Sequence, residues 1–165
     1  MKKNMKKEPG KIEIISKSVE QTIEVARLIG EKLKGGDLLA LSGELGSGKT
    51  CFTKGLALGL GVSEEYQITS PTFTLINEYP ARCKLYHFDV YRLNGYAELE
   101  DLGYEEYLAG DGVVVIEWAE KIAKLIPPDS IFINFEYIDE NSRKMIIRGL
   151  KSSLSEMIDK KMEVS

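Results

Sequence analysis

The first part of the chain has the pattern of a strand followed by an amphipathic helix. Lys11–Ser16 has the apolar content of a β-strand, and Ser18 with Gln21 forms an N-cap and capping-box pair that opens a helix. We expect this helix to continue to about Lys34, where Gly35 and Gly36 end it. Its apolar residues recur at helical spacing, which predicts one face in the core: Val19, Ile23, Ala26, Ile29 and Leu33.

Two short runs of apolar residues are typical of strands buried inside a parallel sheet. Residues 37–42 form the first run, and residues 113–116 form the second. The second run is the most apolar and β-branched in the chain, so we expect it to be a central strand. The other strands are predicted at 74–79, 84–90, 130–137 and 144–149.

The connection between two of these strands indicates that the sheet is mixed. Residues 74–79 and 84–90 are separated by a turn of four residues, which is too short for a parallel crossover and favours an antiparallel hairpin. Helices are expected at 51–60, 96–102, 105–108 and 118–125, with a weak amphipathic helix from Ser152 onward. The predicted fold class is α/β, with a P-loop NTPase-like mixed central β-sheet flanked by helices.

Composition narrows the class of protein. A chain of 165 residues with 43% hydrophobic and 29% charged residues is expected to form one soluble domain over residues 1–165, without a membrane span and in the cytoplasm. A formal net charge of −4 argues against nucleic-acid binding through neutralised phosphates. We expect residues 1–10 to be a flexible tail and residues 151–165 a C-terminal helix or tail. The tail lysines are Lys2, Lys3, Lys6 and Lys7.

Residues 43–50, GELGSGKT, form a complete phosphate-binding loop of the pattern GxxxxGK[ST] between a predicted strand and a predicted helix. Glycines let the backbone N–H groups form a concave nest for phosphate oxygens, and the helix N-terminus adds its positive end. Lys49 supplies a charge for the β- and γ-phosphates, and the Thr50 hydroxyl can ligate Mg²⁺. The predicted nucleotide contacts here are Gly43, Glu44, Leu45, Gly46, Ser47, Gly48, Lys49, Thr50 and Cys51.

A phosphate-binding loop needs a second acidic group, normally at the end of a neighbouring strand. Glu117 directly follows the apolar run 113–116, as in a Walker B strand, so we assign it with Thr50 to the metal. Asp89 also ends a strand, but that strand mixes polar and aromatic residues and is expected to be more peripheral. Asp89 is therefore assigned a catalytic or switch role, and the predicted catalytic residues are Lys49, Asp89 and Glu117.

Several motifs of other nucleotide-binding classes are missing from the sequence. The chain has no NKxD motif, no DxxG after the loop and no LSGGQ-type signature, which disfavours Ras-like GTPases and transporter ATPases. It also lacks the arginine-rich lid of small-molecule kinases. These absences favour ATP over GTP as the ligand. A small nucleoside or metabolite kinase and a nucleotide-gated binding module without turnover stay open as alternatives.

Together with the loop, three further motifs carry a family resemblance: SPTFTLINEY at 70–79, HFDVYR at 87–92 and IEW at 116–118. The set resembles the bacterial TsaE (YjeE) family, P-loop ATPases that assist the synthesis of threonylcarbamoyladenosine in tRNA. The resemblance implies ATP and Mg²⁺ as ligands, with Thr50 and Glu117 on the metal. It also implies TsaD and TsaB as partners, with tRNA reached only through that complex.

The same resemblance suggests roles for residues outside the loop. The segment containing Thr72 would be a switch near the γ-phosphate, and Asp89 would be needed for hydrolysis. Thr22 and Arg143 would lie near the adenine. Independently of the resemblance, Trp118 directly follows Glu117, which is explained equally well by a core residue or by a wall of the site. Cys51 departs from the family pattern, which usually has Thr after GKT. His87, the single histidine, is equally well explained as a packed residue or as a functional one.

Overall fold

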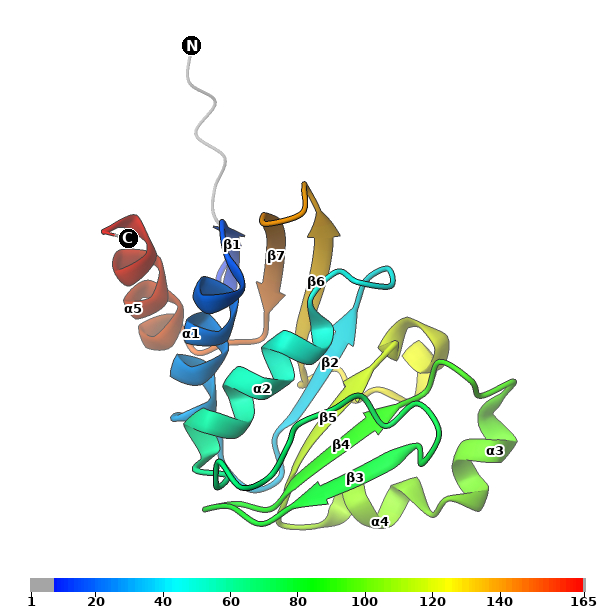
Figure 1. The fold of residues 1–165 in the computed structure, drawn as a ribbon. Helices are drawn as coiled ribbons and strands as arrows, with labels where there is room; N and C mark the ends of the chain where they lie inside the picture. Colours follow the sequence, from blue (N-terminus) through cyan, green and yellow to red (C-terminus); the bar gives the residue numbers. More distant parts are fainter. Residues whose placement is uncertain (1–7, 165) are drawn as a thin grey trace.

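The computed structural model describes residues 8–164 and contains one seven-stranded mixed sheet (Figure 1). The strand order across the sheet is β1-β7-β6-β2-β5-β4-β3. The bounds of the strands are β1 (Lys11–Ser16), β2 (Leu38–Ser42), β3 (Ile76–Tyr79), β4 (Leu85–Asp89), β5 (Val113–Glu117), β6 (Ile131–Tyr137) and β7 (Arg143–Arg148). Residues 1–7, which include most of the predicted N-terminal tail, lie outside the described residues.

The sheet has a parallel centre and antiparallel edges. Strand β2 is parallel to both β5 and β6, and β4 is parallel to β5. The pairs β3–β4, β6–β7 and β1–β7 are antiparallel. The predicted hairpin between β3 and β4 and the mixed sheet are therefore confirmed, as is the central position of β5.

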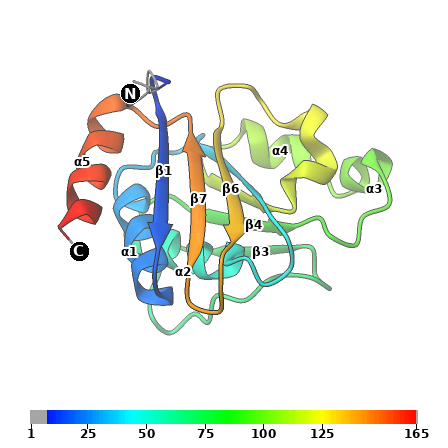
Figure 2. The same ribbon diagram turned by 90° about the horizontal axis from the view of Figure 1, so that it is seen from above.

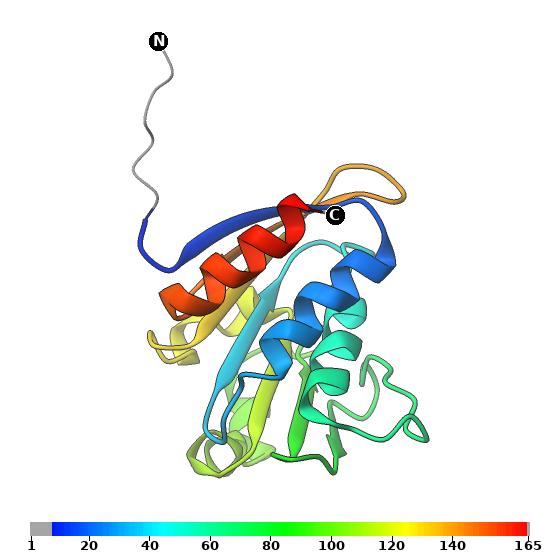
Figure 3. The same ribbon diagram turned by 90° about the vertical axis from the view of Figure 1, so that its left-hand side faces the viewer.

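Three helices cover one face of the sheet: α1 (Val19–Gly30), α2 (Lys49–Leu60) and α5 (Ser152–Glu163), and Figure 3 shows them side by side. Two short helices and a 3₁₀ helix pack on the opposite face of the β2-β5-β4 half. They are α3 (Tyr96–Asp101), α4 (Tyr104–Ala109) and η1 (Ala119–Leu125). In Figure 2, α3 and α4 lie at the end of the molecule away from α5 and β1.

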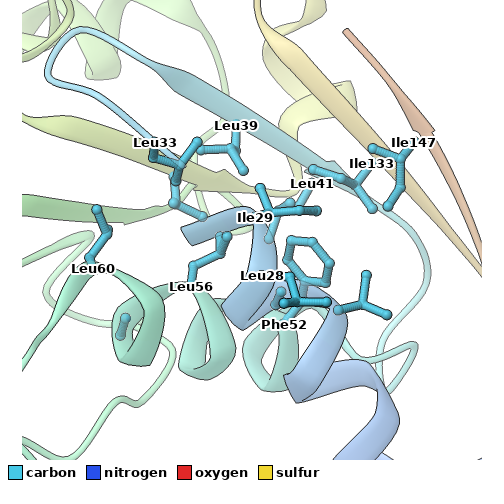
Figure 4. Packing of buried hydrophobic residues seen from close by; sticks show 14 of the residues in the cluster. Leu28, Ile29, Leu33, Leu39, Leu41, Phe52, Leu56, Leu60, Ile133 and Ile147 are labelled. Carbon is cyan, nitrogen blue, oxygen red and sulfur yellow. The ribbon is translucent and has the colours of Figure 1, made fainter. Parts of the chain in front are cut away.

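The larger core lies between α1, α2 and the sheet. Leucines and isoleucines of α1 and α2 meet side chains of β2, β6 and β7, with Phe52 at the centre (Figure 4). The two helices approach closely because Gly30, Gly55 and Gly59 present only backbone at their contact. This packing fixes α2, whose first residue is Lys49, on the sheet.

Three predictions about the elements need correction. Helix α1 ends at Gly30 rather than near Lys34, since the following N–H groups of Lys32 and Leu33 make tighter i→i−3 bonds to Ile29 and Gly30. Leu33 is nevertheless buried, which is why its helical spacing was misleading. Strand β3 begins at Ile76 rather than at residue 74, because residues 72–74 form a turn.

The third correction concerns the second half of the sheet. Trp118 does not start a helix: it has a left-handed backbone (φ 63°), and η1 begins only at Ala119. Strand β4 is more peripheral than β5, as predicted, because only β3 lies beyond it, yet His87, Phe88 and Asp89 are all buried. Its polar side chains, His87 and Asp89, are buried because they make hydrogen bonds with other polar side chains of the site.

Helix α5 confirms the predicted C-terminal helix and is joined to α1 by an ion pair. The Lys161 ammonium lies 2.8 Å from Glu24 Oε1, and Arg27 Nη2 lies 2.8 Å from the same oxygen. Hydrogen bonds from Arg27 and then Lys161 lower the pKa of Glu24 to about 2. No helix within residues 8–164 is both long enough and apolar enough to cross a membrane.

Candidate nucleotide site

The phosphate-binding loop joins the end of β2 to the start of α2, as predicted. Gly43, Gly46 and Gly48 have φ angles of 151°, 76° and 110°, a region that L-residues rarely adopt. Gly48 is the N-cap of α2 and provides no side-chain cap, so the first N–H groups of the helix are free to bind a ligand. The loop therefore has the backbone geometry of an anion-binding nest.

The Lys49 ammonium is held inside the loop. It donates hydrogen bonds to the carbonyl oxygens of Gly43 at 2.5 Å and Glu44 at 2.9 Å. It also lies 3.9 Å from the centre of the Trp118 ring, a cation–π contact. Burial lowers the pKa of Lys49, an effect that the nearby Glu117, Glu120 and Asp89 carboxylates oppose. The charge thus sits where phosphate oxygens would approach the loop.

Thr50 and Glu117 lie together at the carboxyl end of neighbouring strands. The Thr50 hydroxyl oxygen is 3.2 and 3.3 Å from the two carboxylate oxygens of Glu117. A hydroxyl beside a carboxylate is a set of hard oxygen donors, which fits Mg²⁺. Within residues 8–164 no three His, Cys, Asp or Glu side chains could hold a metal by themselves. Mg²⁺ is commonly bound by one or two carboxylates together with water and substrate phosphates, so Thr50 and Glu117 are the residues that would hold it.

Asp89 pairs with Glu117 across β4 and β5, so the two predicted acids lie side by side. The Ser70 hydroxyl donates to Asp89 Oδ2, and the Thr72 hydroxyl lies 3.4 Å from the same oxygen. The other oxygen, Oδ1, accepts from the Tyr91 N–H at 2.9 Å. Asp89 therefore connects Ser70 and Thr72 to the end of strand β4.

These residues line one open cleft of about 330 Å³, here called the P-loop cleft. The Arg143 guanidinium reaches it from β7 and packs on Gly48, where an added Cβ would lie 2.7 Å from Nη1. Arg143 Nε is buried and has no hydrogen-bond partner among the described residues, so a ligand could accept a hydrogen bond from it. The cleft is lined by Leu45, Gly46, Ser47, Gly48, Lys49, Thr50, Cys51, Ser70, Thr72, Asp89, Tyr91, Glu117, Trp118 and Arg143.

Thr22 is the predicted contact that lies apart from the cleft. Its buried hydroxyl is 2.8 Å from the Ser16 hydroxyl and 3.3 Å from the Ser18 carbonyl oxygen. Gly43 and Glu44 do not line the cleft either, and their carbonyl oxygens accept hydrogen bonds from the Lys49 ammonium. A nucleotide contact by Thr22 stays a prediction.

One lining residue was missed by the sequence analysis. The Tyr91 ring packs against Trp118 with ring centres 4.7 Å apart and ring planes tilted by 41°, and the Tyr91 carbonyl oxygen accepts a hydrogen bond from Lys121. The signal that could have identified it is its place in the motif HFDVYR, two residues after Asp89. A larger cavity of about 540 Å³ lies beside α5, at the opposite end of β2, and contains none of the predicted site residues.

Comparisons with known proteins show the family to which the chain is similar. The family described as threonylcarbamoyl adenosine biosynthesis protein TsaE matches residues 16–145. The tRNA threonylcarbamoyladenosine biosynthesis protein TsaE of Treponema pallidum is 43% identical over 133 residues, covering 81% of this chain and 97% of that protein. Its counterpart in Bacillus subtilis is 43% identical over 127 residues, covering 76% of this chain and 78% of that protein.

A solved structure confirms the fold. The crystal structure of Bacillus subtilis YdiB matches with a TM-score of 0.71 at 33% identity, covering 93% of this chain and 94% of that one. The predicted P-loop NTPase-like fold is therefore confirmed. Because the family match includes the loop, both acidic strand ends and Arg143, the chain belongs to the TsaE family of threonylcarbamoyl adenosine biosynthesis proteins.

Proposed function

We propose that this protein binds and hydrolyses ATP with Mg²⁺, and that it thereby supports threonylcarbamoyladenosine synthesis in tRNA. The observation that carries the proposal is the convergence of Lys49, Thr50, Glu117 and Asp89 on one cleft at the N-terminus of α2. Family membership supports the pathway. The charged and hydroxyl side chains of the cleft support the binding of ATP with Mg²⁺.

Each residue has a role that follows from its position. The loop N–H groups and Lys49 bind the phosphates, and Thr50 with Glu117 would hold Mg²⁺. The bound Mg²⁺ would neutralise charge on the β- and γ-phosphate oxygens. Asp89 orients the attacking water or transmits the state of the γ-phosphate to segment 70–74, through the hydroxyls of Ser70 and Thr72. Trp118 and Tyr91 wall the cleft with aromatic surface.

We propose that the partners are TsaD and TsaB, with tRNA engaged only through their complex. Two large apolar side chains project into solvent around the cleft: Leu45 on the loop is 85% exposed, and Phe73 on segment 70–74 is 84% exposed. Both side chains are therefore accessible to a protein partner that approaches the cleft. Because Phe73 follows Thr72 directly, a change at Asp89 can alter the surface offered to a partner.

Substitution of Lys49 tests the nucleotide proposal. Lys49→Ala is expected to abolish hydrolysis and weaken ATP binding, because it removes the cation that contacts the β- and γ-phosphates. Lys54→Ala is the matched control, since Lys54 is an exposed lysine of the same helix. The readouts are ATP turnover and ATP affinity with Mg²⁺. Normal turnover by Lys49→Ala would show that this cleft is not the hydrolytic site.

A pull-down with TsaD–TsaB under ATP, ADP and no nucleotide tests the partner proposal. We expect binding that depends on nucleotide state, and a loss of that dependence in Thr72→Ala. Complex formation that needs ATP but proceeds without turnover would favour the nucleotide-gated module. Acceleration of turnover by a phosphate-accepting metabolite would favour the kinase. Binding by Thr72→Ala with unchanged nucleotide dependence would refute the switch role of segment 70–74.

A further inference from the structure

The position of His87 is unusual for a polar side chain. His87 is the only histidine of the chain, lies in the middle of strand β4 and is 0% exposed. Its neighbours along the strand include buried Leu85 and Phe88. Burying an imidazole in such a place is unfavourable unless its polar atoms are satisfied, so the contacts of the ring decide what it does.

One ring nitrogen has a short contact with the site. His87 Nε2 lies 2.7 Å from Glu117 Oε1. The sheet register explains this contact: His87 pairs with Val115 and Asp89 pairs with Glu117, so His87 lies one step below the two acids on the same face. The other ring nitrogen, Nδ1, has no partner among the described residues. The hydrogen-bond network therefore places the proton on Nε2, which donates to the carboxylate.

The contact with His87 is the shortest that the Glu117 carboxylate makes. Thr50 Oγ1 lies 3.2 and 3.3 Å from the two carboxylate oxygens, and the Ser70 hydroxyl lies 3.4 Å from Oε2. Among the described residues that hydrogen-bond to this carboxylate through a side chain, His87 is the one that lies in a strand of the sheet. Thr50 and Ser70 both belong to parts of the chain that face the cleft.

We propose that His87 is a positioning residue: its Nε2–H holds Glu117 Oε1 and fixes the carboxylate toward Thr50, so that the metal-side oxygens are in place before nucleotide arrives. This inference rests on the proposed Mg²⁺-dependent nucleotide binding. It also accounts for the buried polar character of β4. The chemistry corresponds to the outer-shell partners that orient carboxylate ligands in metal sites.

The first test uses the single histidine as its own probe. In ¹⁵N-labelled protein without a histidine tag, the imidazole gives one pair of nitrogen resonances. We expect one tautomer, with Nε2 protonated and Nδ1 unprotonated. Glu117→Leu, which removes the acceptor, is expected to shift the Nε2 resonance. A ring protonated on Nδ1 alone, which has no Nε2–H to donate, or resonances that do not respond to Glu117→Leu, would overturn the proposal.

The second test separates positioning from simple packing. Affinity for a non-hydrolysable ATP analogue is measured calorimetrically across a Mg²⁺ titration and in EDTA. For His87→Leu we expect the Mg²⁺ requirement to rise about 10- to 100-fold, the usual effect of losing an outer-shell partner, with affinity in EDTA unchanged. His87→Gln is expected to restore most of the Mg²⁺ response, because its amide nitrogen can donate from a position near that of Nε2.

The matched control is Ser130→Ala. Ser130 is also buried, and its hydroxyl has no hydrogen-bond partner within residues 8–164, but it precedes β6 at the opposite end of the parallel strands. It is expected to respond to Mg²⁺ like wild type. A packing role alone would lower the thermal stability of His87→Leu and leave its Mg²⁺ response normal, which would overturn the inference. Failure of His87→Gln to recover would overturn it as well.

The design also distinguishes failure of the proposed function. If wild type binds the analogue without any Mg²⁺ dependence, the proposed metal site is wrong and the positioning role falls with it. If wild type shows the dependence and His87→Leu shows it equally, only the positioning role is wrong. Should His87→Leu fail to fold, the positioning role is still tested by the ¹⁵N measurement on wild type and by the Mg²⁺ response of His87→Gln.

Discussion

Helix propensity alone predicts that Gly55→Ala stabilises the protein, whereas the contact between α1 and α2 predicts that it destabilises it. Gly55 lies in the middle of α2 and faces α1. A Cβ added there would lie 2.3 Å from the backbone oxygen of Ile23 and 2.5 Å from Ala26 Cβ. Ordinary contacts begin near 3.4 Å, so α1 and α2 would have to separate locally by about 1 Å.

The expected free-energy change is the difference between two terms. Replacing glycine by alanine inside a helix stabilises by about 1 kcal/mol. Overpacking costs about 1–3 kcal/mol, and the upper end applies because the closest atom belongs to the backbone of α1 rather than to a flexible side chain. We therefore expect a net destabilisation of about 1–2 kcal/mol, which corresponds to a loss of about 2–8 °C in Tm for a chain of this size.

Urea unfolding measured by circular dichroism tests this expectation, with Lys54→Ala on the exposed face of α2 as the control. The control should stay within about 0.5 kcal/mol of wild type. Since α2 begins at Lys49, we also expect weaker ATP binding by Gly55→Ala. If Gly55→Ala were as stable as wild type or more stable, helix propensity would outweigh packing, and the reasoning about the α1–α2 contact would be wrong.

Two further predictions concern charge. Glu117→Gln is expected to weaken Mg²⁺-dependent nucleotide binding, because an amide is a poorer ligand for a hard cation, whereas Asp89→Asn should bind nearly normally and turn over slowly. Nucleotide affinity measured across a Mg²⁺ titration tests both variants. If the Mg²⁺ dependence were lost in Asp89→Asn and kept in Glu117→Gln, the two roles would have to be exchanged. The folded pKa of Glu24 is about 2, below its ordinary value of 4.5, so its ion pairs should stabilise the fold above pH 4.5 and lose that effect as the pH falls through 2. The urea midpoints of wild type and Glu24→Gln should therefore converge between those pH values, and a constant difference would contradict the assignment.

Much of the site could be predicted because its signal is local. The loop from Gly43 to Thr50 needs glycines at set positions and a strand and helix on either side, and all of these are adjacent in the sequence. Glu117 directly follows the apolar run 113–116, so its place at the carboxyl end of a central strand was also predictable. The resemblance to TsaE, carried by short motifs, was confirmed by the family match.

The fold class was predictable for the same reason. Strand and helix periods and the short turn before β4 are local features, and they were enough to indicate a mixed sheet. The errors lie where neighbours in space override local pattern. The apolar spacing that reaches Leu33 suggested a longer helix, although that residue is buried in a turn, and Trp118 takes a left-handed backbone beside Lys49 and Tyr91.

The sequence by itself therefore determined the phosphate-binding loop, the two acidic strand ends and the α/β class, because each depends on residues that are neighbours in the chain. Only the tertiary structure decided that His87 contacts Glu117, that Ser70 and Thr72 bind Asp89, and that Arg143 covers Gly48. These contacts depend on strand order and register, which bring residues 17 to 95 positions apart to one edge of the sheet. Register is set by burial of whole strand faces over the core, so it does not appear in any single segment of the sequence.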